Sequence, residues 1–309
     1  MKSFAKINWT LDVLHRREDG FHEIRTIYQT VSLFDRLEIT EATDGISVEC
    51  NDPRVPCDES NLVYKAAAAL EGAVTVKQTA GGNERFADCT REAGPARVGA
   101  RIRIEKHIPV GGGLGGGSSN AAAALIGLNR LWGLDLGFDQ LFKIAAAIGS
   151  DVPFFLVGGT ALGAGRGEEV YPIGDVFCDT LLLASPGTSV STASAYKGLK
   201  RLTMARSVSI MPFTLLAANG IRKLPLEVWN DLEQSVLVTN PEIDEIKRRL
   251  MALGARQAQM SGSGATVFGI FENSAKVLSA ETTLKSDGIW CKHVVTVDKA
   301  EYQRKVFES

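Results

Sequence analysis

The 309-residue sequence predicts an α+β protein of two domains. In its first half, strand patterns indicate an antiparallel sheet and helical patterns follow them, so this half is mixed α and β. In its second half, strands alternate with helices, which indicates a separate sheet. We expect the domains to be residues 1–163 and 164–309, with the boundary in the region 158–167.

The first strand is expected over residues 5–13, because apolar and polar side chains alternate there with the period of a half-buried strand. A turn signal, Glu18-Asp19-Gly20, follows it. The other elements expected in the first half are extended stretches at 22–33 and 36–40, helices at 61–70, 121–132 and 138–148, and a strand at 100–105. Residues 74–98 show neither period and are interpreted as a surface excursion.

The second half is predicted from the same signals. We expect strands at 180–184, 266–271 and 292–297, and helices at 192–199, 228–238, 243–253 and from 274 onward. No internal repeat is evident along the chain.

Composition limits the classes of partner. Lys and Arg number 34 against 36 Asp and Glu, so no global basic field exists to hold nucleic acid or an anionic membrane. The five cysteines show no metal-site spacing, which favours reduced thiols. No signal segment and no apolar run of about 20 residues is found. We therefore expect a cytoplasmic protein that binds neither nucleic acid nor a membrane.

A glycine-rich segment is the most informative motif. Six of the seven residues from Gly111 to Gly117 are glycine, and because glycine tolerates positive φ, the main-chain N–H groups here can converge on an anion. Ser118 and Ser119 suit the N-cap of the following helix, whose first turn adds free N–H donors and the positive end of its dipole. The segment predicts a phosphate site at the start of a helix.

Three alternative interpretations fit this segment less well. Residues 111–116 match G-x-G-x-x-G, but nearly any run so rich in glycine does, and residues 106–109 separate it from the expected strand, unlike a dinucleotide-binding turn. A Walker A loop is excluded because no Lys-Ser or Lys-Thr follows the last glycine. A flexible linker would not normally run directly into a capped helix.

Polar residues elsewhere are candidates for chemistry. Lys6 and Asn8 project from one face of the first strand. That face could line a cleft, but a solvated strand face is the simpler interpretation of these two residues. Asp151 follows a helix end and precedes an apolar run. Its carboxylate suits a general base or metal ligand in a partly dry pocket, or an Asx-turn, and both interpretations stay open on the residues alone.

Two further motifs are ambiguous by themselves. Phe21 and His22 can stack on and hydrogen-bond to a planar heterocycle, although a turn-flanking core aromatic with an incidental histidine is simpler. The other three histidines form no spaced cluster, and we assign them no metal. A second glycine turn, at residues 260–266, is a tight turn into a strand or a second anion contact.

Taken together, these motifs resemble a known superfamily in order and spacing. Residues 109–120, with 5–8 before them and 261–265 after them, resemble the three motifs of the GHMP kinases. Within that superfamily, residues 17–23, 149–155 and 186–192 resemble the family of bacterial 4-diphosphocytidyl-2-C-methyl-D-erythritol kinases. The resemblance implies an N-terminal ribosomal protein S5 domain 2-like domain and a C-terminal ferredoxin-like α/β domain, with the active site in the cleft between them.

The resemblance also implies an activity. It is the ATP-dependent phosphorylation of the 2-hydroxyl group of CDP-methylerythritol, in the mevalonate-independent route to isoprenoids. Asp151 would accept the hydroxyl proton, and Lys6 would orient the acceptor and stabilise anionic charge. ATP would bind, with Mg²⁺, to Pro109, Val110, Gly111, Gly112, Gly113, Leu114, Gly115, Gly116, Gly117, Ser118 and Ser119, with Asn61 and Lys106 near the adenosine.

On the acceptor side, the resemblance places cytosine between two aromatic rings and a histidine backbone. These correspond to Phe21, Tyr196 and His22, with Asn8 near the erythritol. The magnesium ligands are not implied, and Glu168 is only a distant candidate. The alternatives are another small-molecule GHMP kinase, for homoserine, mevalonate or a sugar, and a non-catalytic sensor on the same fold. We expect a monomer or a weak homodimer.

Overall fold

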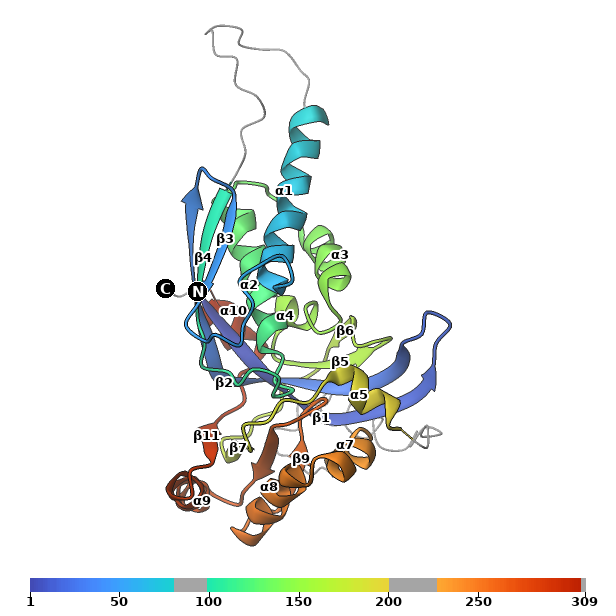
Figure 1. The fold of residues 1–309 in the computed structure, drawn as a ribbon, viewed down its shortest axis with the longest axis vertical. Helices are drawn as coiled ribbons and strands as arrows, with labels where there is room; N and C mark the ends of the chain where they lie inside the picture. Colours follow the sequence, from blue (N-terminus) through green and yellow to red (C-terminus); the bar gives the residue numbers. More distant parts are fainter. Residues whose placement is uncertain (81–98, 200–226, 307–309) are drawn as a thin grey trace, which may run out of the picture.

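The computed structural model describes residues 1–80, 99–199 and 227–306, which form two sheets with helices on them (Figure 1). The first sheet has the strand order β3-β4-β2-β1-β8, with β5 paired to β2 and β6 paired to β5. Its strands are β1 (Lys2–Arg16), β2 (His22–Ala42), β3 (Ile46–Cys50), β4 (Gly99–Glu105), β5 (Thr160–Ala164), β6 (Glu169–Pro172) and β8 (Trp229–Asn230).

A long antiparallel ribbon of β1 and β2 runs through the middle of this sheet (Figure 1). The two stretches expected at 22–33 and 36–40 are one strand, β2, because irregularities in the pairing bend the ribbon without ending it. The prediction that β1 is half-buried is also wrong. Both faces of β1 are covered, and its polar residues Lys6, Asn8, Thr10 and Asp12 are buried.

Helices cover one face of the first sheet (Figure 1). They are α1 (Leu62–Ala80), α2 (Gly116–Leu131), α3 (Phe138–Ile148) and the short α4 (Phe154–Val157). Helix α2 begins earlier than expected, with Gly115 at its N-cap in the left-handed conformation at φ 68°. Ser118 and Ser119 therefore lie inside the first turn and are not caps, because the glycines before them can already adopt helical geometry.

The second sheet is antiparallel and has the order β11-β7-β10-β9. Its strands are β7 (Leu181–Ser185), β9 (Gln257–Met260), β10 (Val267–Ile270) and β11 (Trp290–Val294). Its helices are α5 (Thr192–Lys197), α7 (Glu233–Thr239), α8 (Pro241–Ala252) and α9 (Ser274–Ser286). The helix expected at 228–238 begins only at Glu233, because residues 229–230 pair with β1 as β8.

The chain crosses between the two sheets more than once. β5 spans the expected boundary at residue 163, and the change of sheet falls between the end of β6 and the start of β7. Strand β8 later returns to the first sheet, and α10 (Lys299–Val306) packs Tyr302 and Val306 against Phe4 of β1. Part of the excursion at 74–98 is the end of α1, and its residues 81–98 lie outside the described residues.

An apolar cluster joins the sheets. It combines residues of β1 and β2 with residues of β7 and β10. At its centre the rings of Trp9 and Phe268 meet edge to face with centroids 5.6 Å apart, and both side chains are fully buried. This contact fixes the second sheet against the strand that carries Lys6 and Asn8.

We predict that Phe268→Ala lowers the free energy of unfolding by about 3–5 kcal/mol, because it leaves a cavity between the sheets. Urea denaturation followed by circular dichroism measures this change. Phe138→Ala is the matched control, since that side chain is 55% exposed and should change stability by less than about 0.5 kcal/mol. Equal losses in the two variants would contradict the joining role of Phe268.

Candidate active site

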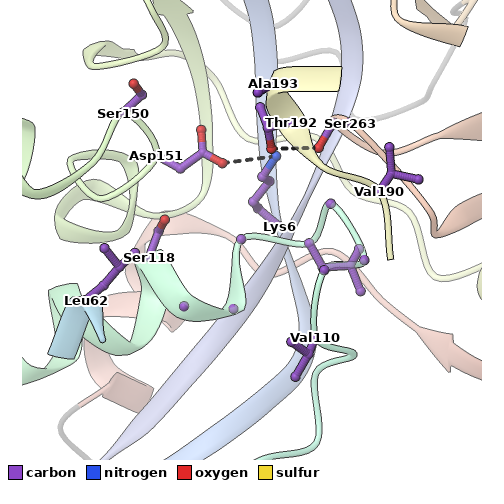
Figure 2. A pocket seen from close by; sticks show the side chains of 18 of the residues that line it. Lys6, Leu62, Val110, Ser118, Ser150, Asp151, Val190, Thr192, Ala193 and Ser263 are labelled. Atoms are coloured by element: carbon purple, nitrogen blue, oxygen red, sulfur yellow. Dashed lines mark hydrogen bonds and ion pairs between the residues drawn. The ribbon is translucent and has the colours of Figure 1, made fainter. Parts of the chain in front are cut away.

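A cleft of about 1260 Å³ lies where the glycine loop, the β1–β2 ribbon and α5 meet (Figure 2). It brings together nearly all of the residues that the sequence predicted. Those lining it are Lys6, Asn8, Phe21, His22, Asn61, Lys106, Pro109, Val110, Gly111, Gly112, Gly113, Leu114, Gly115, Gly116, Gly117, Ser118, Asp151 and Tyr196. Residues far apart in the sequence, from Lys6 to Tyr196, thus share one cavity.

The glycine loop is held in a conformation that requires glycine. Gly111, Gly113 and Gly115 have φ of 68°, 72° and 68°, a region that L side chains rarely adopt. The second glycine turn packs directly on the loop: Ser261 Oγ donates to the Gly113 carbonyl oxygen at 3.1 Å. A Cβ atom on Gly113 would lie 2.1 Å from the Ser261 carbonyl oxygen. The second turn therefore buttresses the loop.

The two serines after the loop point in different directions. Ser118 lines the cleft (Figure 2). Ser119 is buried, its hydroxyl oxygen lies 2.7 Å from Ser3 Oγ, and its N–H donates to the Gly115 carbonyl oxygen. The structure therefore places Ser119 outside the predicted phosphate site, because successive helical residues face different sides and this one faces the sheet.

Lys6 and Asp151 form an ion pair, with 3.4 Å between Lys6 Nζ and Asp151 Oδ2 (Figure 2). Lys6 is almost fully buried, and its ammonium group also donates to Asn8 Oδ1 at 2.6 Å. Asn8 Nδ2 in turn donates to Thr26 Oγ1 at 2.6 Å. The Asp151 side chain keeps 31% exposure at the cleft surface. A buried cation and a partly exposed carboxylate therefore meet inside the cavity.

Aromatic side chains lie at another part of the cleft. The rings of His22 and Tyr196 stack with centroids 5.1 Å apart and an interplanar angle of 21°. Burial, with a smaller effect of Arg16, lowers the pKa of His22 and favours the neutral imidazole. Phe21 is 52% exposed, and the guanidinium carbon of Arg166 lies 4.9 Å from its ring centroid.

Asn61 and Lys106 line the cleft, but their polar atoms are engaged within the protein. Asn61 Oδ1 accepts from the Val63 N–H at the start of α1 at 2.8 Å, and Asn61 Nδ2 donates to the Pro56 carbonyl oxygen. Lys106 Nζ lies 2.5 Å from Oδ2 of the fully buried Asp35. These two side chains shape the wall of the cleft.

Sequence reasoning missed several residues that hold the site. Thr26 and Tyr28 support Asn8 and Asp151 from β2, and Arg166 covers Phe21. Asn230 donates to the carbonyl oxygens of Met260 and Gly262 and so fixes the second glycine turn. No local motif marks these residues, because each acts across strands or between distant segments.

Metal ligands are not evident from the side chains. Within residues 1–80, 99–199 and 227–306, no group of three or more His, Cys, Asp or Glu side chains could hold a metal ion. Glu168, the distant candidate, pairs with Arg166 at 3.1 Å and does not line the cleft.

None of the described helices is both long and apolar enough to cross a membrane.

Comparison with known proteins decides the family. Residues 61–159 match the GHMP kinases N terminal domain, and residues 216–288 match the GHMP kinases C terminal domain. A 4-diphosphocytidyl-2-C-methyl-D-erythritol kinase from Thermodesulfovibrio yellowstonii is 39% identical over 96% of this chain and 97% of its own length. One from Shouchella clausii is 40% identical over 90% of this chain and 87% of its own.

The chain belongs to the GHMP kinase superfamily and, within it, to the 4-diphosphocytidyl-2-C-methyl-D-erythritol kinase family. The predicted two-domain GHMP kinase fold is confirmed. A crystal structure of a 4-(cytidine 5'-diphospho)-2C-methyl-D-erythritol kinase matches with TM-score 0.75 and 32% identity, over 96% of this chain and 99% of that one. A homoserine kinase from Cytophaga hutchinsonii shares the fold at TM-score 0.63 and 18% identity, over 97% and 96% of the two chains.

We predict that Gly113→Ala in this GHMP kinase weakens ATP binding by roughly tenfold or more. Its Cβ atom would press on the Ser261 carbonyl oxygen at a residue with positive φ, so the loop must leave its present path. Isothermal titration calorimetry with ATP measures the change.

Gly72→Ala is the control for this prediction, because that exposed glycine in α1 has no atom within 4 Å of its added Cβ and should bind ATP like the wild type. Wild-type affinity in Gly113→Ala would show that the tight packing of the loop is not needed to bind ATP.

Proposed function

We propose that this kinase transfers the γ-phosphoryl group of ATP to the 2-hydroxyl group of 4-diphosphocytidyl-2-C-methyl-D-erythritol. The products are the 2-phosphate and ADP, in the mevalonate-independent route to isoprenoid precursors. The single observation that carries the proposal is the Lys6–Asp151 pair, which lies in one cleft with both the glycine loop and the aromatic residues. The proposed phosphate site, the proposed general base and the proposed cytosine site would thus share one cleft.

The glycine loop suits the donor. Its backbone has positive φ at Gly111, Gly113 and Gly115. It leads into α2, a helix of 16 residues whose N-terminal end faces the cleft. Free N–H groups and the positive end of the helix dipole favour phosphate there. The N–H of Lys6 donates to the Leu114 carbonyl oxygen at 3.0 Å and ties the loop to β1. The donor phosphates would therefore lie close to the Lys6 side chain.

Asp151 suits the role of the base in this reaction. Its Oδ2 atom lies 3.4 Å from Lys6 Nζ, and the side chain is partly exposed to the cleft. It would accept the proton of the 2-hydroxyl group as that oxygen attacks phosphorus. The ammonium group of Lys6 would orient the hydroxyl group and stabilise charge on the transferred phosphoryl group. A positioned base contributes roughly 10²- to 10⁴-fold to rate, and alignment of the two substrates contributes much of the rest.

Mg²⁺ would enter with the nucleotide. Mg²⁺ in kinase sites takes many of its ligands from phosphate oxygens and water, so a cleft without a dedicated cluster of acidic residues in the described part of the chain fits such an ion. Ser118, whose hydroxyl group lines the cleft beside the loop, is the side chain that we assign to the phosphates or their metal ion. The ion supplies charge neutralisation on the phosphates.

The acceptor would bind at the part of the cleft lined by Phe21, His22 and Tyr196. Phe21 and Tyr196 would stack on the cytosine, the His22 backbone would hydrogen-bond to it, and Asn8 would lie near the erythritol. Because the His22 ring stacks on Tyr196 in this structure, we infer that the two rings separate or shift when the cytosine binds. Arg166, held over Phe21 by its pair with Glu168, would add a cation beside the nucleotide.

Two further expectations concern the setting of the reaction. A cytoplasmic location agrees with the four free thiols among the described residues, Cys50, Cys57, Cys178 and Cys291. A monomer or weak homodimer stays a prediction.

We predict that the purified protein with Mg²⁺ and ATP phosphorylates CDP-methylerythritol and leaves homoserine, mevalonate and galactose unreacted. ADP release in a coupled assay, with the product identified by phosphorus NMR, measures this. CDP should compete with the acceptor, because in this proposal Phe21 and Tyr196, which line the cleft, hold the cytosine. Turnover of one of the other alcohols instead, without competition by CDP, would favour another GHMP kinase activity.

We predict that Asp151→Asn lowers kcat by roughly 10²- to 10⁴-fold and leaves the affinity for ATP within about twofold, because the amide cannot accept the proton. Single-turnover kinetics and ATP titration measure the two quantities. Asp139→Asn, at an exposed position in the first turn of α3, is the control and should turn over like the wild type. Undiminished turnover in Asp151→Asn would refute Asp151 as the base.

A further inference from the structure

Tyr28 of β2 and Lys6 of β1 contact different oxygen atoms of the Asp151 carboxylate. Tyr28 Oη donates to Asp151 Oδ1 at 3.0 Å, whereas Asp151 Oδ2 lies 3.4 Å from Lys6 Nζ. The two oxygen atoms of one carboxylate are therefore held by side chains of two neighbouring strands. A partial rotation of the carboxylate about its Cβ–Cγ bond would break both contacts, whereas a half-turn only exchanges the two equivalent oxygen atoms.

The ring of Tyr28 is itself fixed by close packing. Its centroid lies 4.8 Å from that of Phe154, and Lys6 Nζ lies 5.4 Å from it. A Cβ atom on Gly163 would lie 2.4 Å from Tyr28 Cε2, and one on Gly167 would lie 2.3 Å from Tyr28 Oη. Two glycines thus let the backbone approach the phenol so closely that the hydroxyl group has little freedom to move.

The phenol is a permanent donor in this environment. Tyr28 is 1% exposed, and burial, followed by the charge of Asp151, raises its pKa well above the ordinary value. The charged and titratable groups around the pair are Lys6 from β1, Tyr196 from α5 and Glu168 beyond the phenol. A neutral phenol donates one hydrogen bond, and its strongest acceptor here is the carboxylate.

We propose that Tyr28 is a positioning residue for phosphoryl transfer, whose hydroxyl group orients Asp151 so that Oδ2 faces both Lys6 and the attacking hydroxyl group. The inference rests on the proposed function, in which Asp151 is the base. The proton of the acceptor moves to Asp151, and the phenol proton stays on Tyr28 throughout. Tyr28 therefore acts on the alignment of the base and not on the binding of either substrate.

The test is Tyr28→Phe, which keeps the ring and its packing and removes only the hydroxyl group. We expect kcat to fall about tenfold, as for loss of one hydrogen bond to a charged group, while KM for ATP and for CDP-methylerythritol stays within about twofold. Tyr302→Phe is the matched control. Tyr302 is also buried, and its hydroxyl group donates to the Phe155 carbonyl oxygen. Removal of that hydroxyl group should lower the melting temperature comparably and leave kcat unchanged.

The possible results separate the explanations. Unchanged kcat in Tyr28→Phe, an equal fall in Tyr302→Phe, or a raised KM for the acceptor with unchanged kcat would each overturn the positioning role. If Tyr28→Phe does not fold, Gly163→Ala replaces it, because its methyl group would lie 2.4 Å from Tyr28 Cε2 and displace the ring while the hydroxyl group remains. That methyl group would also lie 2.9 Å from Thr26 Cγ2, so a fall in kcat with unchanged KM for the acceptor supports the positioning role, and any other result overturns it.

Asp151→Asn, measured in parallel, tests the proposed function separately. If Asp151→Asn stays active, Asp151 is not the general base. An inactive Asp151→Asn beside an unaltered Tyr28→Phe refutes only the inference about Tyr28.

Discussion

The burial of one ammonium group organises the centre of this kinase. Lys6 lies on a strand whose two faces are both covered, and an isolated charge in such a place is strongly unfavourable. The charge is accommodated by the Asn8 amide oxygen, by the Asp151 carboxylate and by the face of the Tyr28 ring. Because these partners come from β1, β2 and the turn after α3, satisfying Lys6 requires the tertiary structure to be complete at this point.

Close backbone approach is the second constraint, and it concentrates at the same place. The loop at Gly113 and the turn at Gly262 pack on each other with no room for side chains, and a Cβ atom on Gly262 would lie 3.2 Å from Lys6 Nζ. Neither glycine segment could keep this conformation alone, because positive φ values are only permitted, not enforced, by glycine. Ser261, which follows β9 of the second sheet, and the Asn230 amide of β8 in the first sheet hold the two segments in place.

The two sheets are consequently one working unit. The Trp9–Phe268 contact holds the second sheet on β1, strand β8 extends the first sheet from the second half of the chain, and α10 returns to pack on Phe4. A cleft lined by residues from Lys6 to Ser263 depends on these crossings. Stability and the geometry of the site are therefore coupled: a cavity between the sheets would also loosen the support of the glycine loop.

The sequence by itself determined the glycine loop and, through the order and spacing of its motifs, the family, because glycine runs and motif spacing are local properties of the chain. Lys6 and Asp151 became a candidate pair only through the resemblance to that family, since the residues alone left a strand face and an Asx-turn open. The sequence also located most helices, with α3 at its expected bounds. Only the tertiary structure decided that β1 is buried on both faces, that Ser119 faces the sheet, and that Thr26, Tyr28, Arg166 and Asn230 support the site. These facts depend on strand register and on contacts between residues far apart in the chain, for which no local periodicity carries a signal.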